Sequence, residues 1–123
     1  MINQFIATFI LTFIITRVFT HILHNKEEIR KSKTLTQKLR NCTNFEIHHI
    51  HLGFLGIILS FFVYMIFGVS NSFIVLVAIN LSLICDQVFP LIFSKICYFS
   101  KLGIGLATIL HLFVVVLSYF YFF

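Results

Sequence analysis

Apolar residues fall into four long runs along this chain, and short polar stretches separate the runs. The runs cover about residues 2–24, 45–67, 73–93 and 102–123. Each has close to the roughly 20 residues that an α-helix needs to cross the hydrocarbon core of a bilayer. The pattern therefore predicts an all-α fold, an integral membrane four-helix bundle that forms a single polytopic domain over residues 1–123.

The composition is also typical of a membrane protein. Of the 123 residues, 59% are hydrophobic and 11% are charged, and the mean hydropathy is +1.02. These values exclude an ordinary soluble domain, and the length leaves room for one bundle without a separate soluble domain. Cys42, Cys85 and Cys97 form no C-x-x-C motif, so we expect them to be small, reduced and buried apolar residues.

Basic residues concentrate in the polar stretch between the first two runs. Six of the nine Lys and Arg residues lie between Lys26 and Arg40, and Lys95 and Lys101 lie between the last two runs. The positive-inside rule places both stretches in the cytoplasm and both termini outside, in a plasma or inner membrane. We therefore expect a short basic cytoplasmic loop between helices 1 and 2, next to anionic lipid headgroups. Leu35, Leu39 and Cys42 have helical spacing, so this segment is expected either as a solvated loop or as a short helix on that surface. No motif for reading RNA or DNA interrupts the runs, so nucleic acid is not an expected partner.

The start of the second run carries two local signals. Thr43 and Glu46 have the S/T-x-x-E spacing of a capping box, which predicts that the second helix begins at Thr43. Gly53 and Gly56 follow shortly afterwards, and their lack of side chains would let another helix approach closely.

Histidines gather at the ends of the first two runs. In a helix His48 and His51 share one face, whereas His49 points elsewhere. His21 and His24 form a second pair with the same spacing at the end of the first run. Because the first two spans are antiparallel, we expect the two pairs to face each other at the cytoplasmic end.

Two charged residues lie inside the predicted spans at comparable depths. Arg17 and Asp86 are each roughly 10 Å below the cytoplasmic surface, at about 1.5 Å per helical residue. Ionisable residues inside a membrane mark functional sites or pair with one another. His111 lies nearer mid-membrane and is expected to take no part in a site at this depth.

Imidazole and carboxylate groups are the ligands that zinc and non-haem iron prefer. The sequence therefore predicts a metal site, with Asp86 or Glu46 as a catalytic base and Arg17 as an anchor for a substrate phosphate or carboxylate. The predicted metal ligands are His21, His24, His48 and His51.

Three functions remain open on the sequence alone. The first is a membrane-embedded metal-dependent hydrolase that acts on a lipid or another amphiphile. The second is a haem-binding anchor of a respiratory complex, with one axial histidine from each of two helices. The third is a non-catalytic assembly subunit or small transporter, in which Arg17 and Asp86 neutralise each other as a buried pair. Each of the three is compatible with a homo- or hetero-oligomer.

Overall fold

The computed structural model describes the backbone of residues 1–31, 35–93 and 96–122, and the side chains of residues 1–23, 50–93 and 96–121. Four helices follow one another along the chain: α1 (Ile2–Lys31), α2 (Leu35–Phe67), α3 (Asn71–Ile92) and α4 (Lys101–Phe122). Each helix contains a stretch that is long and apolar enough to cross a membrane. The predicted all-helical fold with four candidate spans is therefore confirmed.

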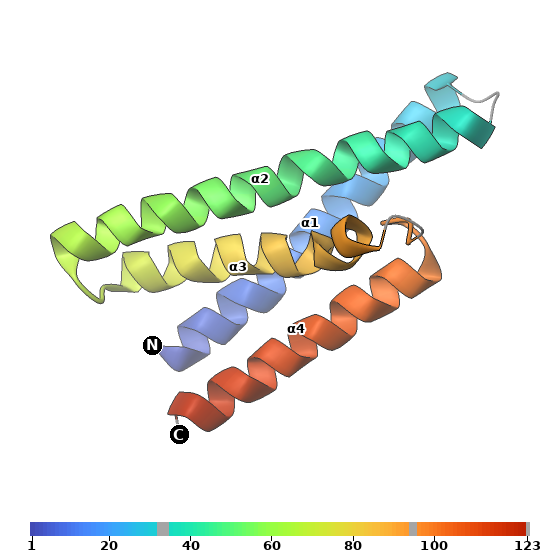
Figure 1. The fold of residues 1–123 in the computed structure, drawn as a ribbon. Helices are drawn as coiled ribbons and strands as arrows, with labels where there is room; N and C mark the ends of the chain where they lie inside the picture. Colours follow the sequence, from blue (N-terminus) through green and yellow to red (C-terminus); the bar gives the residue numbers. More distant parts are fainter. Residues whose placement is uncertain (32–34, 94–95, 123) are drawn as a thin grey trace.

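The third helix lies at the centre of the molecule. α3 contacts α1, α2 and α4, and α1 also contacts α4, whereas α1 and α2 make no contact within the described residues. α2 runs along α3 while α1 crosses it, and both termini lie at the same end of the molecule as the α2–α3 turn (Figure 1). The positions of the other three helices therefore depend on their contacts with residues of α3.

The basic stretch between the first two spans is helical over most of its length. α1 continues to Lys31, and α2 begins at Leu35 rather than at Thr43. Residues 26–31 and 35–42 contain no Gly or Pro, and they are rich in Lys, Arg, Glu, Gln and Leu, which favour helices. Helical hydrogen bonding therefore continues past the apolar runs. The expectation of a helix start at Thr43 is wrong because the residues before Thr43 also favour a helix.

A tight turn sets α2 antiparallel to α3. Gly68 has φ 65°, a left-handed conformation that glycine adopts easily, and its N–H donates to the Tyr64 carbonyl at 2.7 Å. Ser70 then caps α3, because its hydroxyl accepts from the Phe73 N–H at 3.2 Å. The turn fixes where the two helices begin to pack.

Small residues bring α2 close to α3. A Cβ atom on Gly56 would lie 1.9 Å from Asn80 Oδ1, and one on Gly53 would lie 2.8 Å from Ile84 Cγ1. The Asn80 amide also donates to the buried Ser60 hydroxyl at 3.4 Å. The prediction that Gly53 and Gly56 allow close approach of another helix is confirmed, and that helix is α3.

The cysteines differ from one another. Cys85 is a free, buried thiol, as expected. Cys97 is disulfide-bonded, so the expectation of a reduced residue is wrong at this position. The side chain of Cys42 lies outside the described residues. Disulfides are typical of oxidising compartments, which bears on the orientation of the bundle.

Candidate functional site

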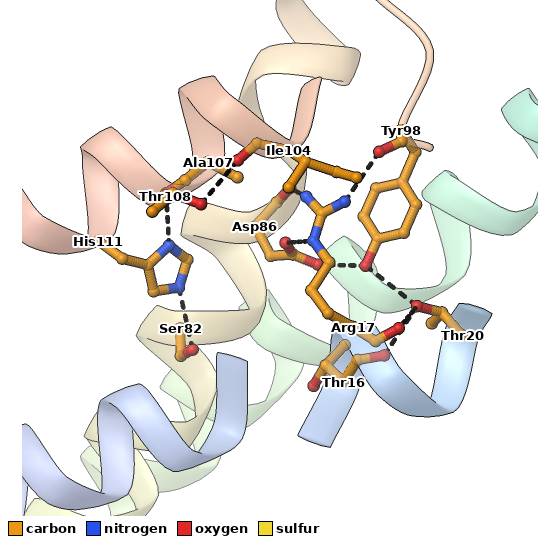
Figure 2. Close-up of polar contacts among 10 residues, drawn as sticks. All are labelled: Thr16, Arg17, Thr20, Ser82, Asp86, Tyr98, Ile104, Ala107, Thr108 and His111. Carbon is orange, nitrogen blue, oxygen red and sulfur yellow. Dashed lines mark hydrogen bonds and ion pairs between the residues drawn. The ribbon is translucent and has the colours of Figure 1, made fainter. Parts of the chain in front are cut away.

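A buried ion pair joins α1 to α3. Arg17 Nε donates to Asp86 Oδ1 at 2.6 Å, and the two side chains are 13% and 1% exposed. Figure 2 shows the guanidinium and the carboxylate pointing toward each other between the two helices. Arg17 and Asp86 therefore form the buried pair expected for the third function considered above.

Arg17 also donates to two backbone carbonyls. Its Nη1 lies 2.8 Å from the Tyr98 carbonyl oxygen, and its Nη2 lies 3.3 Å from that of Asp86. The Asp86 carbonyl can accept because Pro90, four residues later in α3, has no N–H to form the usual helical hydrogen bond. The proline thus supplies an acceptor to a buried cation that would otherwise leave N–H groups unpaired.

Tyr98, from the connection between α3 and α4, closes the cluster. Its hydroxyl donates to Asp86 Oδ2 and lies 3.5 Å from Thr20 Oγ1, and its ring centroid is 4.0 Å from Arg17 Cζ. Burial, followed by the neighbouring Asp86 carboxylate, raises the pKa of Tyr98, so the phenol stays protonated and acts as a donor. Both carboxylate oxygens of Asp86 therefore have donors from within the chain (Figure 2).

A second buried polar contact joins α3 to α4. His111 Nδ1 lies 2.7 Å from the Ala107 carbonyl, which can only accept, so Nδ1 carries a proton. In the neutral imidazole, Nε2 then accepts from the Ser82 hydroxyl at 3.1 Å (Figure 2). The rings of Phe9 and Phe13 pack against the imidazole at centroid distances of 4.8 and 4.0 Å. His111 is therefore held in place by contacts from three helices.

Only two of the four predicted metal ligands, His21 and His51, have side chains that the structure describes. His21 and His51 are both exposed, and they lie on α1 and α2, which do not touch there. The side chains of His24, His48 and Glu46 lie outside the described residues. Among residues 1–23, 50–93 and 96–121, no group of three or more His, Cys, Asp or Glu residues could hold a metal ion.

The Asp86 carboxylate is engaged by contacts within the chain in this arrangement. Its two carboxylate oxygens accept from Arg17 and Tyr98, and the residue is 1% exposed. Arg17 in turn uses three N–H groups on acceptors of the same chain. The predicted roles of a catalytic base and a substrate anchor would therefore require the cluster to open.

One buried polar atom near the histidine-rich segment lacks a partner. Gln87 is 1% exposed, and its Oε1 accepts no hydrogen bond within the described residues. Gly56 lies against Asn80 and Gly53 against Ile84, so the antiparallel register places Gln87 at about the level of residue 50 on α2.

The sequence patterns did not identify Tyr98 or Pro90 as part of the site. Tyr98 lies in a short connection that has no periodicity, so nothing in the pattern sets it apart. The usable signal was the spacing of Asp86 and Pro90, because a proline four residues after a buried carboxylate frees the carbonyl of that same residue. Comparison with protein-family models, with curated proteins and with solved structures finds no match to this chain.

Proposed function

We propose that this chain is an integral multi-pass membrane protein that acts as a non-catalytic anchor or assembly subunit of a larger membrane complex. The Arg17–Asp86–Tyr98 cluster carries the proposal, because its charges and donors are used to join three segments of the chain. A cluster satisfied in this way stabilises the relative positions of helices rather than presenting a free acid or base to a substrate.

The surface of the helices supports membrane insertion. Large hydrophobic side chains are exposed along α2 and α4, such as Phe61, Ile66, Leu112 and Phe120. A soluble protein rarely exposes so continuous an apolar surface, whereas helices that contact lipid or neighbouring membrane helices require one. Both homo- and hetero-oligomers would cover part of this surface.

Charge supports the orientation with both termini outside a plasma or inner membrane. Eight of the nine basic residues fall in the two connections that lie at the opposite end from the termini, where they would meet an anionic cytoplasmic leaflet. The disulfide at Cys97 favours the opposite orientation, since the cytosol is reducing. We give the charges more weight, because many basic residues act together on the topology during insertion.

Accessibility labelling tests this orientation. Single-cysteine tags are introduced at Met1, Ser32 and Phe123 in a variant whose native cysteines are replaced by serine. A membrane-impermeant maleimide should label the tags at Met1 and Phe123 in intact cells, and the tag at Ser32 only after permeabilisation. Labelling of the Ser32 tag alone in intact cells would establish the opposite orientation, in agreement with the disulfide.

A metal-dependent membrane hydrolase is the second candidate. The paired spacing of His21 with His24 and of His48 with His51 supports it. In this candidate the four histidines bind zinc or iron, and Glu46 acts as the base on a lipid or another amphiphile. Asp86 would serve only after release from Arg17 and Tyr98.

Elemental analysis and a visible spectrum of the purified protein distinguish the candidates. The anchor proposal expects neither stoichiometric metal nor haem, together with migration in an assembly larger than the 14.3 kDa chain on native gels of its own membranes. Bound zinc or iron without haem, lost in His48→Ala or His51→Ala but retained in the matched His49→Ala control, would establish the metal site instead. Haem absorbance would support the haem-binding anchor.

A further inference from the structure

An apolar groove opens between the N-terminal ends of α1 and α3, at the end of the molecule away from Arg17 and Asp86. Its volume is about 510 Å³. The side chains that line it come chiefly from α1 and α3 and include Ile2, Phe5, Phe73, Ile74, Val77 and Leu81. None of these side chains carries a hydrogen-bonding group.

The groove follows from the way α1 crosses α3. The two helices meet at Phe9 and Ala78, both 0% exposed, and the Phe5 ring stacks on that of Phe9 at a centroid distance of 5.7 Å. Toward their N-terminal ends the helices separate (Figure 1). The lining residues beyond the crossing point, Val77 and Ile74 among them, are therefore only partly buried by α1.

We propose that this groove binds one acyl chain of a membrane lipid. The proposal rests on the membrane insertion proposed above, because the surrounding solvent must then be hydrocarbon. An apolar cavity of about 150 Å³ stays dry and binds benzene, so a groove several times larger suits an extended hydrocarbon chain. Pockets for small ligands usually hold a few polar groups that orient the ligand, and the side chains of this one supply none.

The lining also determines what the groove does not recognise. The adjoining turn, residues 68–72, contains no charged side chain that could pair with a phosphate or carboxylate. Inside a bilayer the hydrophobic effect provides little driving force for moving an acyl chain. The binding free energy comes instead from dispersion contacts between the acyl chain and the side chains that line the groove. These contacts are absent when the groove is unfilled. Recognition by the side chains of the groove therefore depends on the length and shape of the acyl chain.

Photolabelling tests the proposal with the full chain in vesicles of dioleoylphosphatidylcholine. A phosphatidylcholine with a diazirine in one acyl chain is incorporated, and the labelled residues are identified by mass spectrometry. We expect label to be enriched at Phe5, Phe73 and Leu81 relative to exposed residues of α4. Replacing the headgroup by phosphatidylglycerol should leave the enrichment unchanged.

Matched phenylalanine substitutions separate the groove from the general lipid surface. Val77→Phe fills the groove and should reduce the enrichment several-fold, whereas Val116→Phe, on the exposed face of α4, should leave it intact. Leu81→Ala enlarges the groove and should retain the label at Phe5 and Phe73, which keeps the test decisive even where Val77→Phe does not fold.

The possible outcomes distinguish this proposal from the proposed function. Uniform label over all exposed apolar residues would overturn the acyl-chain site while leaving membrane insertion standing. No label on α4 would argue against insertion itself. Label on α4 with none at the groove residues would mean that lipid does not reach the groove, and it would also overturn the acyl-chain site.

Discussion

The third helix holds its two principal neighbours by different means. Toward α1 it presents Asp86, a buried carboxylate whose oxygens accept from Arg17 and Tyr98. Toward α2 it presents Asn80, a neutral amide that packs against Gly56 where no side chain intervenes. The first contact depends on a few strong polar interactions, whereas the second depends on the fit of two surfaces.

This difference determines how the stability of the protein should respond to substitutions at each contact. A buried charge that loses its partner remains in a low-dielectric region, so most of the loss comes from desolvation of the remaining charge. A close packing contact that gains a methyl group is instead destabilised by strain that neighbouring atoms can partly relax. The α1–α3 contact should therefore show strong coupling between its members, and the α2–α3 contact should respond chiefly to side-chain volume.

The largest expected effect is the loss of one member of the ion pair. Arg17→Met or Asp86→Leu alone should lower the free energy of unfolding by about 3–5 kcal/mol, because each leaves an unpaired buried charge. The double variant should recover much of that loss. Denaturant unfolding in lipid nanodiscs measures all three proteins, and additive losses in the double variant would contradict the coupling.

Removal of the Tyr98 hydroxyl should have the next largest effect. Tyr98→Phe should cost about 1.5–3 kcal/mol, the range for a hydrogen bond to a charged group. The cost should nearly vanish in an Asp86→Leu background, where there is no carboxylate to accept. Tyr121→Phe, at a position 88% exposed, is the matched control and should leave the free energy of unfolding unchanged.

Alkaline pH provides a second measurement on Tyr98. Its pKa is raised in the folded protein, so its contribution to stability is complete below the ordinary tyrosine pKa of about 10 and falls as the pH rises above that value. The wild type should therefore lose stability more steeply above this pH than Tyr98→Phe does. Equal slopes for the two proteins would mean that ionisation of Tyr98 does not change the free energy of unfolding.

The packing contact between α2 and α3 should respond to volume. Gly56→Ala should lower the free energy of unfolding by about 1–3 kcal/mol, because the added Cβ would meet Asn80 Oδ1 at 1.9 Å. Asn80→Ala should relieve much of that loss in the double variant. Gly105→Ala is the matched control: a Cβ there meets nothing within 4 Å, and a gain of up to about 1 kcal/mol follows from helix propensity. A similar loss in both alanine variants would contradict the close approach.

The smallest effect on stability is expected in the basic segment between the first two spans. Changing Lys33, Lys38 and Arg40 to Gln should alter the free energy of unfolding in neutral lipid by less than about 0.5 kcal/mol. The same variant should insert less uniformly, or bind anionic vesicles more weakly, because the positive charge is reduced. A large loss of stability in neutral lipid would mean that this segment packs on the bundle.

The sequence by itself determined the number of helices and the presence in each of a stretch long and apolar enough to cross a membrane. Helix formation over some 20 apolar residues depends on local composition and length, and both are visible in the chain. It also placed Arg17 and Asp86 at similar depths, because depth follows from counting residues along antiparallel helices. The two glycines of α2 likewise indicated a close contact without naming its partner.

Only the tertiary structure decided which helices meet and which side chains join the cluster. The rotation of each helix about its axis and the crossing of α1 over α3 place Arg17 beside Asp86, and they leave α1 and α2 apart within the described residues. Tyr98 enters the cluster from a connection whose path no periodic pattern encodes. Depth along a helix is a local property that can be counted, whereas contacts between side chains depend on how all the helices pack together.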